Sequence, residues 1–400
     1  MKIALVCPYD ISQYGGVQNQ VLEFAVRARK VGHDVTVIGP NSKEERRYGF
    51  VSIGKPMPIP VGKGTVPKLA LLYNHGKLRE LLENGHFDVV HVHEPVAPAI
   101  GPDALEYTDI KTSALVTTSH TNMTPNLVTW AYSTFGRMLG RDHLIDKVQV
   151  RTAVSLAAAN RANHYLPGSY VIIPNGIDVA RFSPANAEPY EKYVDGKINI
   201  LFVGRLGEHE RRKGLDNLVS AFNALNVRYP NTRLLVVGPG KPDKDTRAII
   251  NAANNENVVL AGPASAADLP RYYQTGDICA FTPTDGESFS LVVAEAMSSG
   301  KPVVTSNIPG PREVLLGYGN YGNDVADSKF FVTGAGILVP PRDVPATTRA
   351  LEMLVRDESV RLGMGARGRD IVMAKFSWDV IAPLILAQYE KLLESRKDVL

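Results

Sequence analysis

Apolar runs too short for helices recur along the first half of the chain and predict strands at residues 2–7, 34–38, 87–92 and 113–118. Between them, apolar residues return every three or four positions, which predicts helices at residues 17–31 and 68–83. Strands that alternate with helices favour βαβ units around a parallel sheet. We therefore expect a Rossmann-like domain over residues 1–173.

The second half repeats this alternation, with strands predicted at residues 198–203, 233–237, 258–260, 278–281 and 302–306 and helices at 215–229 and 291–297. A second Rossmann-like domain is expected over residues 197–376. Residues 174–196 are polar and rich in Pro, as in a linker, and place a cleft between the two sheets. Residues 377–400 predict a C-terminal helix, bent at Pro383, that closes the second domain or crosses back to the first.

Composition agrees with this α/β, two-domain organisation. A chain of 400 residues that is 44% hydrophobic and 21% charged is globular and can bury two cores. The net charge of +3 is too small to indicate nucleic acid as a partner, but it allows an anionic substrate or a loose membrane contact. Cys7 and Cys279 lie in apolar strands, not in a metal-ligand spacing, which indicates a reducing cytoplasm. We expect a cytoplasmic protein without a signal peptide or membrane span.

Two carboxylates, Glu287 and Glu295, flank the start of the helix predicted at 291–297. The Gly- and Ser-rich turn before this helix leaves backbone N–H groups free to bind an anion such as phosphate. Glu287 could then reach hydroxyls beside the phosphate, and Glu295 could accept hydrogen bonds from a ribose. The alternative is an ordinary helix start, with one acidic residue at the positive end of the helix dipole and another in solvent.

Further polar groups follow the other predicted strands, where ligands of doubly wound sheets collect. Gly15 and Gly16 follow the first strand, and Arg205 opens a cationic loop that includes residues 211–213. His91 and His93 share one face of their strand, and either structural or catalytic use is open for both. His120 ends the next strand among polar residues, which favours a site. Each of these features can also be explained without a ligand, as an ordinary turn or a solvated surface.

One glycine pattern argues against a nicotinamide dehydrogenase. Gly317, Gly319 and Gly322 have dinucleotide-like spacing, but they follow a helical segment and precede no clear amphipathic helix. The glycines after the first strand lack that spacing altogether.

The ordered set of motifs resembles family 4 of the retaining glycosyltransferases, which have the GT-B fold, from Met1 to about Trp378. The motifs are Gly15-Gly16, His91 to Pro95, Ser119 to Thr121, Pro174 to Asp178, Gly204-Arg205 with Arg212 to Gly214, and Gly286 to Phe289 with Glu295. Within that family the opening residues 6–18 and His93-Glu94-Pro95 are most similar to the bacterial phosphatidylinositol mannosyltransferases. The resemblance implies transfer of a hexose, mannose from GDP-mannose or another sugar from a UDP-sugar, to a lipid-linked or polyol acceptor such as phosphatidylinositol.

The resemblance also implies a donor site. Gly16 would contact the donor diphosphate, and Arg205 and Lys213 would neutralise it. Glu287 would hold hydroxyls of the transferred sugar, and Glu295 would hold the ribose. Backbone N–H groups would be offered to phosphate by Ser288, Phe289, Ser290 and Leu291. No cofactor is required; Mg²⁺ can accompany the diphosphate, but no carboxylate cluster has the spacing of a metal site.

On the acceptor side, His120 would sit beside the reacting sugar, and Tyr9 would help to hold an inositol ring, with Gly15 and Thr121 nearby. The implied catalytic set is thus His120, Arg205, Lys213 and Glu287. Because negative charge develops on the departing diphosphate, fixed cations supply most of the stabilisation. The family retains configuration by a front-face route in which the leaving phosphate takes the acceptor proton; a double displacement through Glu94 is the alternative.

Three positions depart from the mannosyltransferase pattern. Ser290 stands where Gly is usual, so a positive φ there would be strained. Pro125 replaces a basic acceptor-binding residue and Val96 replaces a polar one, so both of these departures concern the acceptor.

The segment 68–83 sets Lys68, Lys77 and Arg79 opposite leucines, a pattern that suits the anionic inner face of the cell membrane as a peripheral contact. Glu80 and Glu83 balance these charges, so an ordinary packed helix is equally expected. Two other functions stay open: a sugar-nucleotide epimerase on the same scaffold, and a nucleotide- or carbohydrate-binding protein without catalysis.

Overall fold

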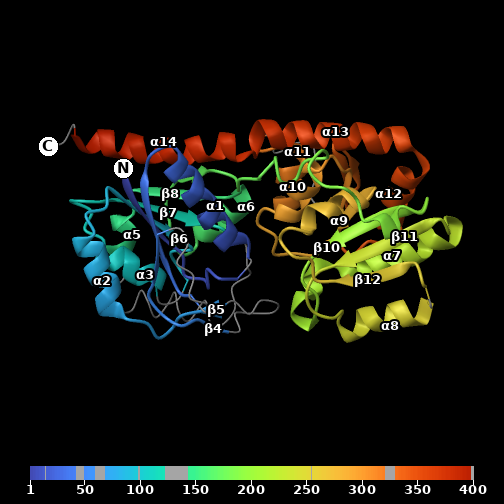
Figure 1. Ribbon diagram of the computed structural model, residues 1–400, viewed down its shortest axis with the longest axis horizontal. Helices are drawn as coiled ribbons and strands as arrows, with labels where there is room; N and C mark the ends of the chain where they lie inside the picture. Colours follow the sequence, from blue (N-terminus) through green and yellow to red (C-terminus); the bar gives the residue numbers. More distant parts are fainter. Residues whose placement is uncertain are drawn as a thin grey trace. The chain divides into compact units, whose positions relative to one another are not determined.

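The computed structural model describes residues 1–13, 15–41, 49–58, 68–97, 100–121, 143–253, 255–319 and 329–397. Its contacts divide the chain into two compact units. The first unit contains Met1–Gly176 and Trp378–Leu400, and the second contains Ile177–Ser377. Each unit is built on its own seven-stranded sheet (Figure 1).

The first sheet is wholly parallel, in the order β3-β2-β1-β6-β7-β8-β9. Its strands are β1 (Lys2–Val6), β2 (Asp34–Gly39), β3 (Phe50–Ser52), β6 (Val89–His93), β7 (Ala114–Ser119), β8 (Val150–Ala153) and β9 (Tyr170–Ile172). The unit also contains the pair β4 (Met57–Pro58) and β5 (Lys68–Leu69), and the short helices α5 (His143–Lys147) and α6 (Leu156–Ala162).

Strand β1 shows how the two faces of this sheet are covered, because successive side chains of a strand point to opposite faces. Ile3 and Leu5 pack into one core with helices α1 (Gly16–Lys30) and α14 (Trp378–Lys397). Ala4 and Val6 pack into the other core with α2 (His75–Asn84) and α3 (Ile100–Tyr107). All four of these β1 side chains are fully buried, as expected for a parallel sheet covered by helices. The C-terminal helix is therefore part of the first unit, and it contains Pro383 in its interior.

The helix predicted at 68–83 is wrong in its first turns. Lys68 and Leu69 form strand β5, which pairs with β4, and the helix begins only at His75. The Asn74 side chain accepts a hydrogen bond from the backbone N–H of Lys77 at 2.9 Å, which fixes the helix start at this point. Leu72, which the helical pattern had assigned to an apolar face, is instead 79% exposed in the preceding turn.

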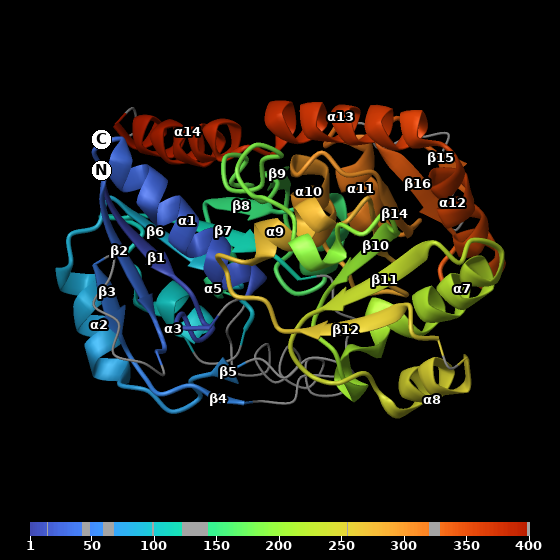
Figure 2. The ribbon, with the colours of Figure 1, turned by 45° about the vertical axis from the view of Figure 1, so that its right-hand side comes forward.

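The second sheet has the order β12-β11-β10-β13-β14-β16-β15, and it is parallel except for its last strand. Its strands are β10 (Ile198–Val203), β11 (Thr232–Val237), β12 (Val258–Gly262), β13 (Ile278–Phe281), β14 (Val303–Ser306), β15 (Phe331–Val332) and β16 (Gly336–Val339). Its helices are α7 (Leu215–Arg228), α8 (Lys244–Ala253), α9 (Leu269–Thr275), α10 (Leu291–Ser298), α11 (Pro309–Leu316), α12 (Val344–Arg356) and α13 (Glu358–Lys375), with 3₁₀ turns η1 (Glu191–Tyr193) and η2 (Glu208–Lys213). Figure 2 shows α10 and α13 side by side in this unit.

Of residues 174–196, expected to be a linker, those from Ile177 onward are packed into the second unit. Phe182 and Tyr193 are 3% and 8% exposed, and the Arg181 guanidinium donates to the Ala266 carbonyl at 2.6 Å. Two large aromatic side chains in a polar segment need a core to cover them, and the second unit supplies it. The chain passes between the units at Gly176–Ile177 and returns at Ser377–Trp378.

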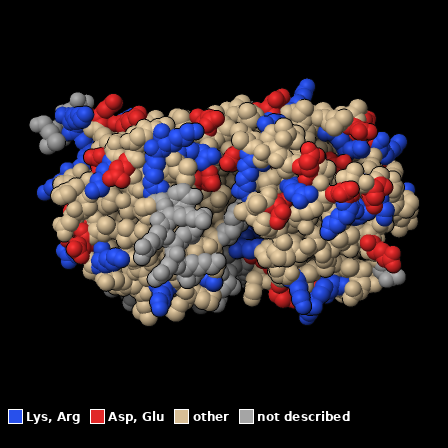
Figure 3. All heavy atoms as spheres, viewed as in Figure 1, with Lys and Arg blue, Asp and Glu red and all other residues tan. Residues whose placement is uncertain are grey.

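On the face shown in Figure 3, the Lys and Arg side chains of the described residues are interspersed with Asp and Glu side chains.

Candidate functional site

In the second unit, the loops that follow β10 and β13 meet at Gly214. This glycine has a φ of 70°, and a Cβ atom added to it would lie 1.8 Å from the carbonyl oxygen of Thr282. Thr282 also donates from its hydroxyl to the Gly214 carbonyl at 2.8 Å. Only glycine permits this approach, because it alone combines a left-handed backbone with no side chain. The contact brings the cationic loop beside the turn that contains Glu287.

Glu287 is the centre of an ion-pair network between these two loops. Its Oε1 accepts from Lys213 Nζ, and Arg212 NH1 lies 3.2 Å from the same oxygen. Arg205, in turn, pairs with Glu210 through NH2 and Oε1 at 2.8 Å. Three cations thus face two carboxylates, so the group is net positive and suited to a polyanionic ligand. Arg211, which the sequence placed in the same cationic run, points elsewhere and pairs with Asp245 at 2.7 Å.

The environment of Glu287 keeps it ionised. Its side chain is 12% exposed, and this burial alone would raise its pKa. The positive charges of Lys213 and Arg212 outweigh burial and hold the pKa below the ordinary value. The carboxylate is therefore a hydrogen-bond acceptor at neutral pH, as a group that binds sugar hydroxyls must be.

Helix α10 begins beside this network, and its first residues take an unusual conformation. Ser290 precedes the helix with a φ of 77° and is 6% exposed, so the positive φ that the sequence flagged as strained is present. Phe289 is buried and packs edge-on against Phe376, with ring centroids 5.5 Å apart. Its side chain is therefore part of the core, and only its backbone remains for a ligand. Ser288 and Leu291 flank this turn, and the first N–H groups of a helix have no intrahelical partner.

Glu295, one turn into α10, has a different environment from Glu287. It is 5% exposed, and the Tyr273 hydroxyl donates to its Oε2 at 2.8 Å. Burial raises its pKa to about 7, and the Tyr273 hydrogen bond opposes that rise only in part. Tyr273 was not anticipated from the sequence, because the residues of α9 give no sign of which ring faces a neighbouring helix.

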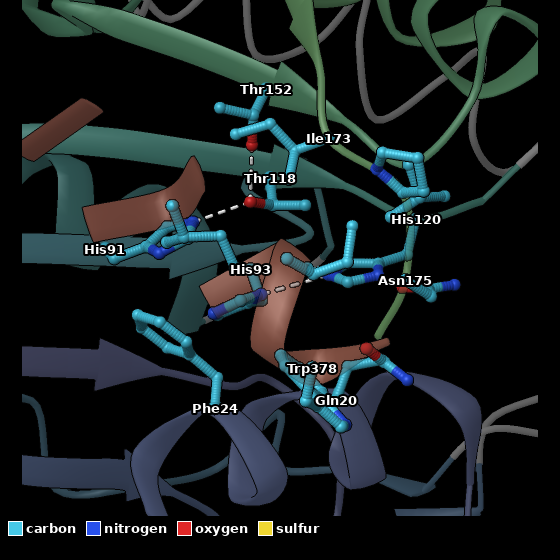
Figure 4. A pocket seen from close by; sticks show the side chains of 14 residues that line it. Gln20, Phe24, His91, His93, Thr118, His120, Thr152, Ile173, Asn175 and Trp378 are labelled. Atoms are coloured by element: carbon cyan, nitrogen blue, oxygen red, sulfur yellow. Dashed lines mark hydrogen bonds between the residues drawn. The ribbon is translucent and has the colours of Figure 1, made fainter. Parts of the chain in front are cut away.

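In the first unit, a chain of buried hydrogen bonds crosses the carboxyl ends of β6, β7 and β8 (Figure 4). The Tyr389 hydroxyl lies 2.5 Å from Nδ1 of His91, and His91 Nε2 lies 2.6 Å from Oγ1 of Thr118. Thr118 continues to Thr152 at 2.6 Å. Burial lowers the pKa of His91 to about 3, so its ring is neutral. These contacts favour the structural interpretation for His91, which fastens helix α14 to the sheet.

His93 and His120 form a second buried pair. His93 Nδ1 lies 2.9 Å from His120 Nε2, and the two rings come from adjacent strand ends. Burial lowers the pKa of His120 to about 4, while a hydrogen bond with the Asn175 side chain raises it slightly in return. Both histidines line a small cavity of about 30 Å³ (Figure 4), whose other walls include Gln20, Phe24, Asn175, Trp378 and Ile381.

Glu94 holds the backbone beside His120. Its carboxylate accepts from the backbone N–H of His120 and, at 3.0 Å, from the hydroxyl of Thr121. Glu94 is 4% exposed and has a φ of 51°, which is uncommon for a residue with a side chain. Because both carboxylate oxygens are used within the protein, the arrangement gives no support to Glu94 as a nucleophile.

The remaining predicted residues lie around the loop after β1. Tyr9 pairs with Leu69 through an isolated β-bridge and is partly buried. Gly15 precedes α1 in an extended conformation, and Gly16 begins the helix and is exposed. Pro125 and Gly322 lie outside the described residues. Within the described residues, no cluster of three or more His, Cys, Asp or Glu side chains is arranged to hold a metal ion.

Both units have a mainly parallel sheet covered by helices, which is the arrangement of the two domains of GT-B glycosyltransferases. Residues 14–181 match the model of Glycosyltransferase Family 4, and residues 197–357 match that of Glycosyl transferases group 1. The chain is 33% identical to the phosphatidyl-myo-inositol mannosyltransferase of Mycolicibacterium smegmatis, over 98% of this chain and 94% of that protein. It belongs to glycosyltransferase family 4 and is a hexosyltransferase.

Solved structures agree on the fold. A glycosyltransferase from Rickettsia africae superimposes with a TM-score of 0.74 and 18% identity, covering 98% of both chains. Anabaena HepE in complex with UDP gives a TM-score of 0.73 and 17% identity, covering 98% of this chain and 100% of that one. In the part of the chain that the structure describes, none of the helices is long and apolar enough to span a bilayer.

Replacement of Ser290 by Gly should stabilise the second unit. The left-handed conformation costs a residue with a side chain about 1–2 kcal/mol, and the extra freedom of Gly in the unfolded chain offsets about 0.5–1 kcal/mol of that gain. We expect a higher melting temperature for Ser290→Gly and a lower one for Ser290→Val. As a control, Ser359→Gly in the regular helix α13 should lower the melting temperature. A lower melting temperature of Ser290→Gly would contradict the claim that the backbone of Ser290 is strained.

Glu295→Gln should change how stability depends on pH. Because the folded-state pKa of Glu295 is raised to about 7, its protonated form stabilises the fold, and that contribution is lost as pH rises from the unfolded value through 7. Relative to wild type, Glu295→Gln should therefore gain up to about 3 kcal/mol between about pH 5 and pH 8 in urea unfolding. Glu287→Gln should show no such gain, because the pKa of Glu287 is lowered. Parallel pH profiles for wild type and Glu295→Gln would contradict the burial argument.

Proposed function

We propose that this enzyme transfers mannose from GDP-mannose to phosphatidylinositol, with retention of the anomeric configuration. The observation that carries the donor half of the proposal is the net positive group formed by Arg205, Arg212 and Lys213 at the carboxyl edge of the second sheet. The similarity to a phosphatidyl-myo-inositol mannosyltransferase over nearly the whole chain supports the sugar and the acceptor.

The cations are proposed to hold the diphosphate as it departs. When the sugar–phosphate bond breaks, negative charge grows on the diphosphate and positive charge grows on the sugar ring. A charge-assisted hydrogen bond from Arg205 or Lys213 contributes about 1.5–3 kcal/mol to binding that charge. Lys213 contacts the Glu287 carboxylate. When the donor binds, a small movement of the Lys213 ammonium would replace this contact with one to a phosphate oxygen.

The turn before α10 is proposed to bind the rest of the donor. The backbone N–H groups of Ser288 to Leu291 lie at the positive end of a helix and suit a phosphate. Glu287 would accept hydrogen bonds from sugar hydroxyls, and Glu295 would accept them from the ribose. Because Tyr273 occupies one oxygen of Glu295, the other oxygen is the one assigned to the ribose.

The first unit is proposed to supply the acceptor side. His120 would lie beside the reacting sugar, Tyr9 would hold the inositol ring with Gly15 and Thr121 nearby, and Gly16 would contact the diphosphate. The proton of the acceptor hydroxyl would go to the departing phosphate, since Glu94 is already engaged with His120 and Thr121. Leu72, 79% exposed beside α2, suits a peripheral contact with the membrane that contains the lipid.

Donor binding should collapse when Arg205 and Lys213 are both replaced by Ala. Two lost charge-assisted contacts should weaken GDP binding at least about 100-fold in calorimetry. Arg211→Ala is the matched control: it removes a neighbouring cation that pairs with Asp245 instead, and its affinity should stay close to that of wild type. Unchanged GDP affinity in the folded double variant would refute the diphosphate site.

Transfer itself is tested by turnover with GDP-mannose and phosphatidylinositol vesicles. We expect an α-linked mannolipid from wild type and none from the double variant, with anomeric configuration read by NMR. Free inositol and a UDP-sugar, offered in place of each substrate, separate the acceptor and donor assignments. Tight GDP binding without any transfer would overturn the proposal in favour of a binding protein, and epimerised sugar without acceptor would favour an epimerase.

A further inference from the structure

His93 lies in the middle of a buried imidazole array in the first unit. Its ring stacks on His91 with centroids 4.2 Å apart, and its Nδ1 meets His120 Nε2 at 2.9 Å (Figure 4). His93 is 4% exposed and His120 is 7% exposed. His91 and His93 lie on one face of strand β6 because alternate residues of a strand share a face. The sheet register then sets His93 opposite Thr118, two residues before His120.

The contacts of His93 indicate which nitrogen of each ring carries a proton. Nε2 of His93 is buried without a hydrogen-bond partner, so a proton there would be a buried N–H without an acceptor, which costs free energy. We therefore place the His93 proton on Nδ1, which donates to Nε2 of His120 and leaves the His120 proton on Nδ1. The Asn175 side chain raises the pKa of His120, as expected of a carbonyl that accepts from this ring N–H. The result is a directed chain from His93 to His120 to Asn175 in which both rings are neutral.

A second contact fixes the backbone of His120. Glu94, the next residue after His93, accepts hydrogen bonds from the backbone N–H of His120 and the hydroxyl of Thr121. It does so with a φ of 51°, a conformation that a residue with a side chain keeps only when its surroundings enforce it. Two consecutive residues at the end of one strand thus hold His120: His93 contacts its ring, and Glu94 holds its main chain.

We propose that His93 is a positioning residue for His120: it fixes the Nδ1-protonated tautomer and the ring plane, while Glu94 fixes the backbone. With both nitrogens engaged, His120 presents a fixed neutral ring to the sugar and exchanges no proton with it. This inference rests on the proposed function, in which His120 lies beside the reacting sugar. It assigns His93 a part in the chemical step and none in donor binding.

The test compares His93→Leu with His93→Asn. The Asn amide occupies the place of Nδ1 and can still donate to His120, whereas Leu keeps the bulk and removes the donor. We expect His93→Leu to lower kcat about 100-fold, the size of loss that follows a displaced group in an active site. His93→Asn should recover most of that loss. The KM for the donor and the affinity for GDP should stay near wild type in both variants. His164→Leu, at an exposed histidine of the same unit, is the control.

The tautomer is measured directly by ¹⁵N NMR of the imidazole nitrogens in the full chain. Wild type and His93→Asn should show His120 protonated at Nδ1, and His93→Leu should show a mixture of tautomers. This readout does not require turnover, so it separates the present inference from the proposed function. Wild-type kcat in a folded His93→Leu variant, or an unchanged His120 tautomer in it, overturns the positioning role. An inactive wild type with the predicted tautomer would overturn the proposed function alone.

Discussion

The second unit depends on one constraint: a carboxylate that is largely buried must be paired. Glu287 meets this requirement by joining Lys213 and Arg212, and in doing so it connects the loop after β10 to the turn before α10. Removal of a cation would leave a buried charge, which is strongly destabilising. The same pairing holds the two cations beside the start of helix α10. The diphosphate site that we propose would therefore use side chains that the fold already requires.

The first unit solves a different problem with neutral groups. Its strand ends bring together three histidines and two threonines, joined by a tyrosine of helix α14, and all of these side chains are buried. Ionised imidazoles could not be buried there, so burial keeps the rings neutral and lets each one donate and accept. The Tyr389 hydroxyl makes the C-terminal helix a member of this network. The helix that returns to the first sheet thereby supports the same strand end that bears His93.

The sequence predicts much of this fold because its strands are continuous apolar runs. The strands at 198–203 and 278–281 have the predicted limits, and β1 and β7 differ from prediction by at most one residue at each end. Periodicity failed at 68–83, where Asn74 starts the helix and a short strand precedes it. The linker predicted from the polar, Pro-rich composition of residues 174–196 is not a separate segment, because the residues from Ile177 onward pack into the second unit, with Phe182 and Tyr193 buried. In both places, a few local contacts outweighed the sequence pattern.

The sequence predicted candidate residues where they belong to a recognisable motif. It did not predict their hydrogen-bond and ion-pair partners, which only the fold brings close to them. Glu287, Lys213 and Arg205 were readable because charges follow strand ends, but the pairing of Arg205 with Glu210 was not. Asn175 lies in the motif from Pro174 to Asp178, which predicted no role for it, and Tyr273 and Tyr389 lie outside every motif. Each of the three contacts a predicted residue. Supporting residues of this kind orient the side chains beside them, and their role depends on the geometry of the fold and not on a sequence pattern. Ser290 is the exception: because it stands where the motif usually has Gly, the sequence alone raised the question of a positive φ, and the structure has one there.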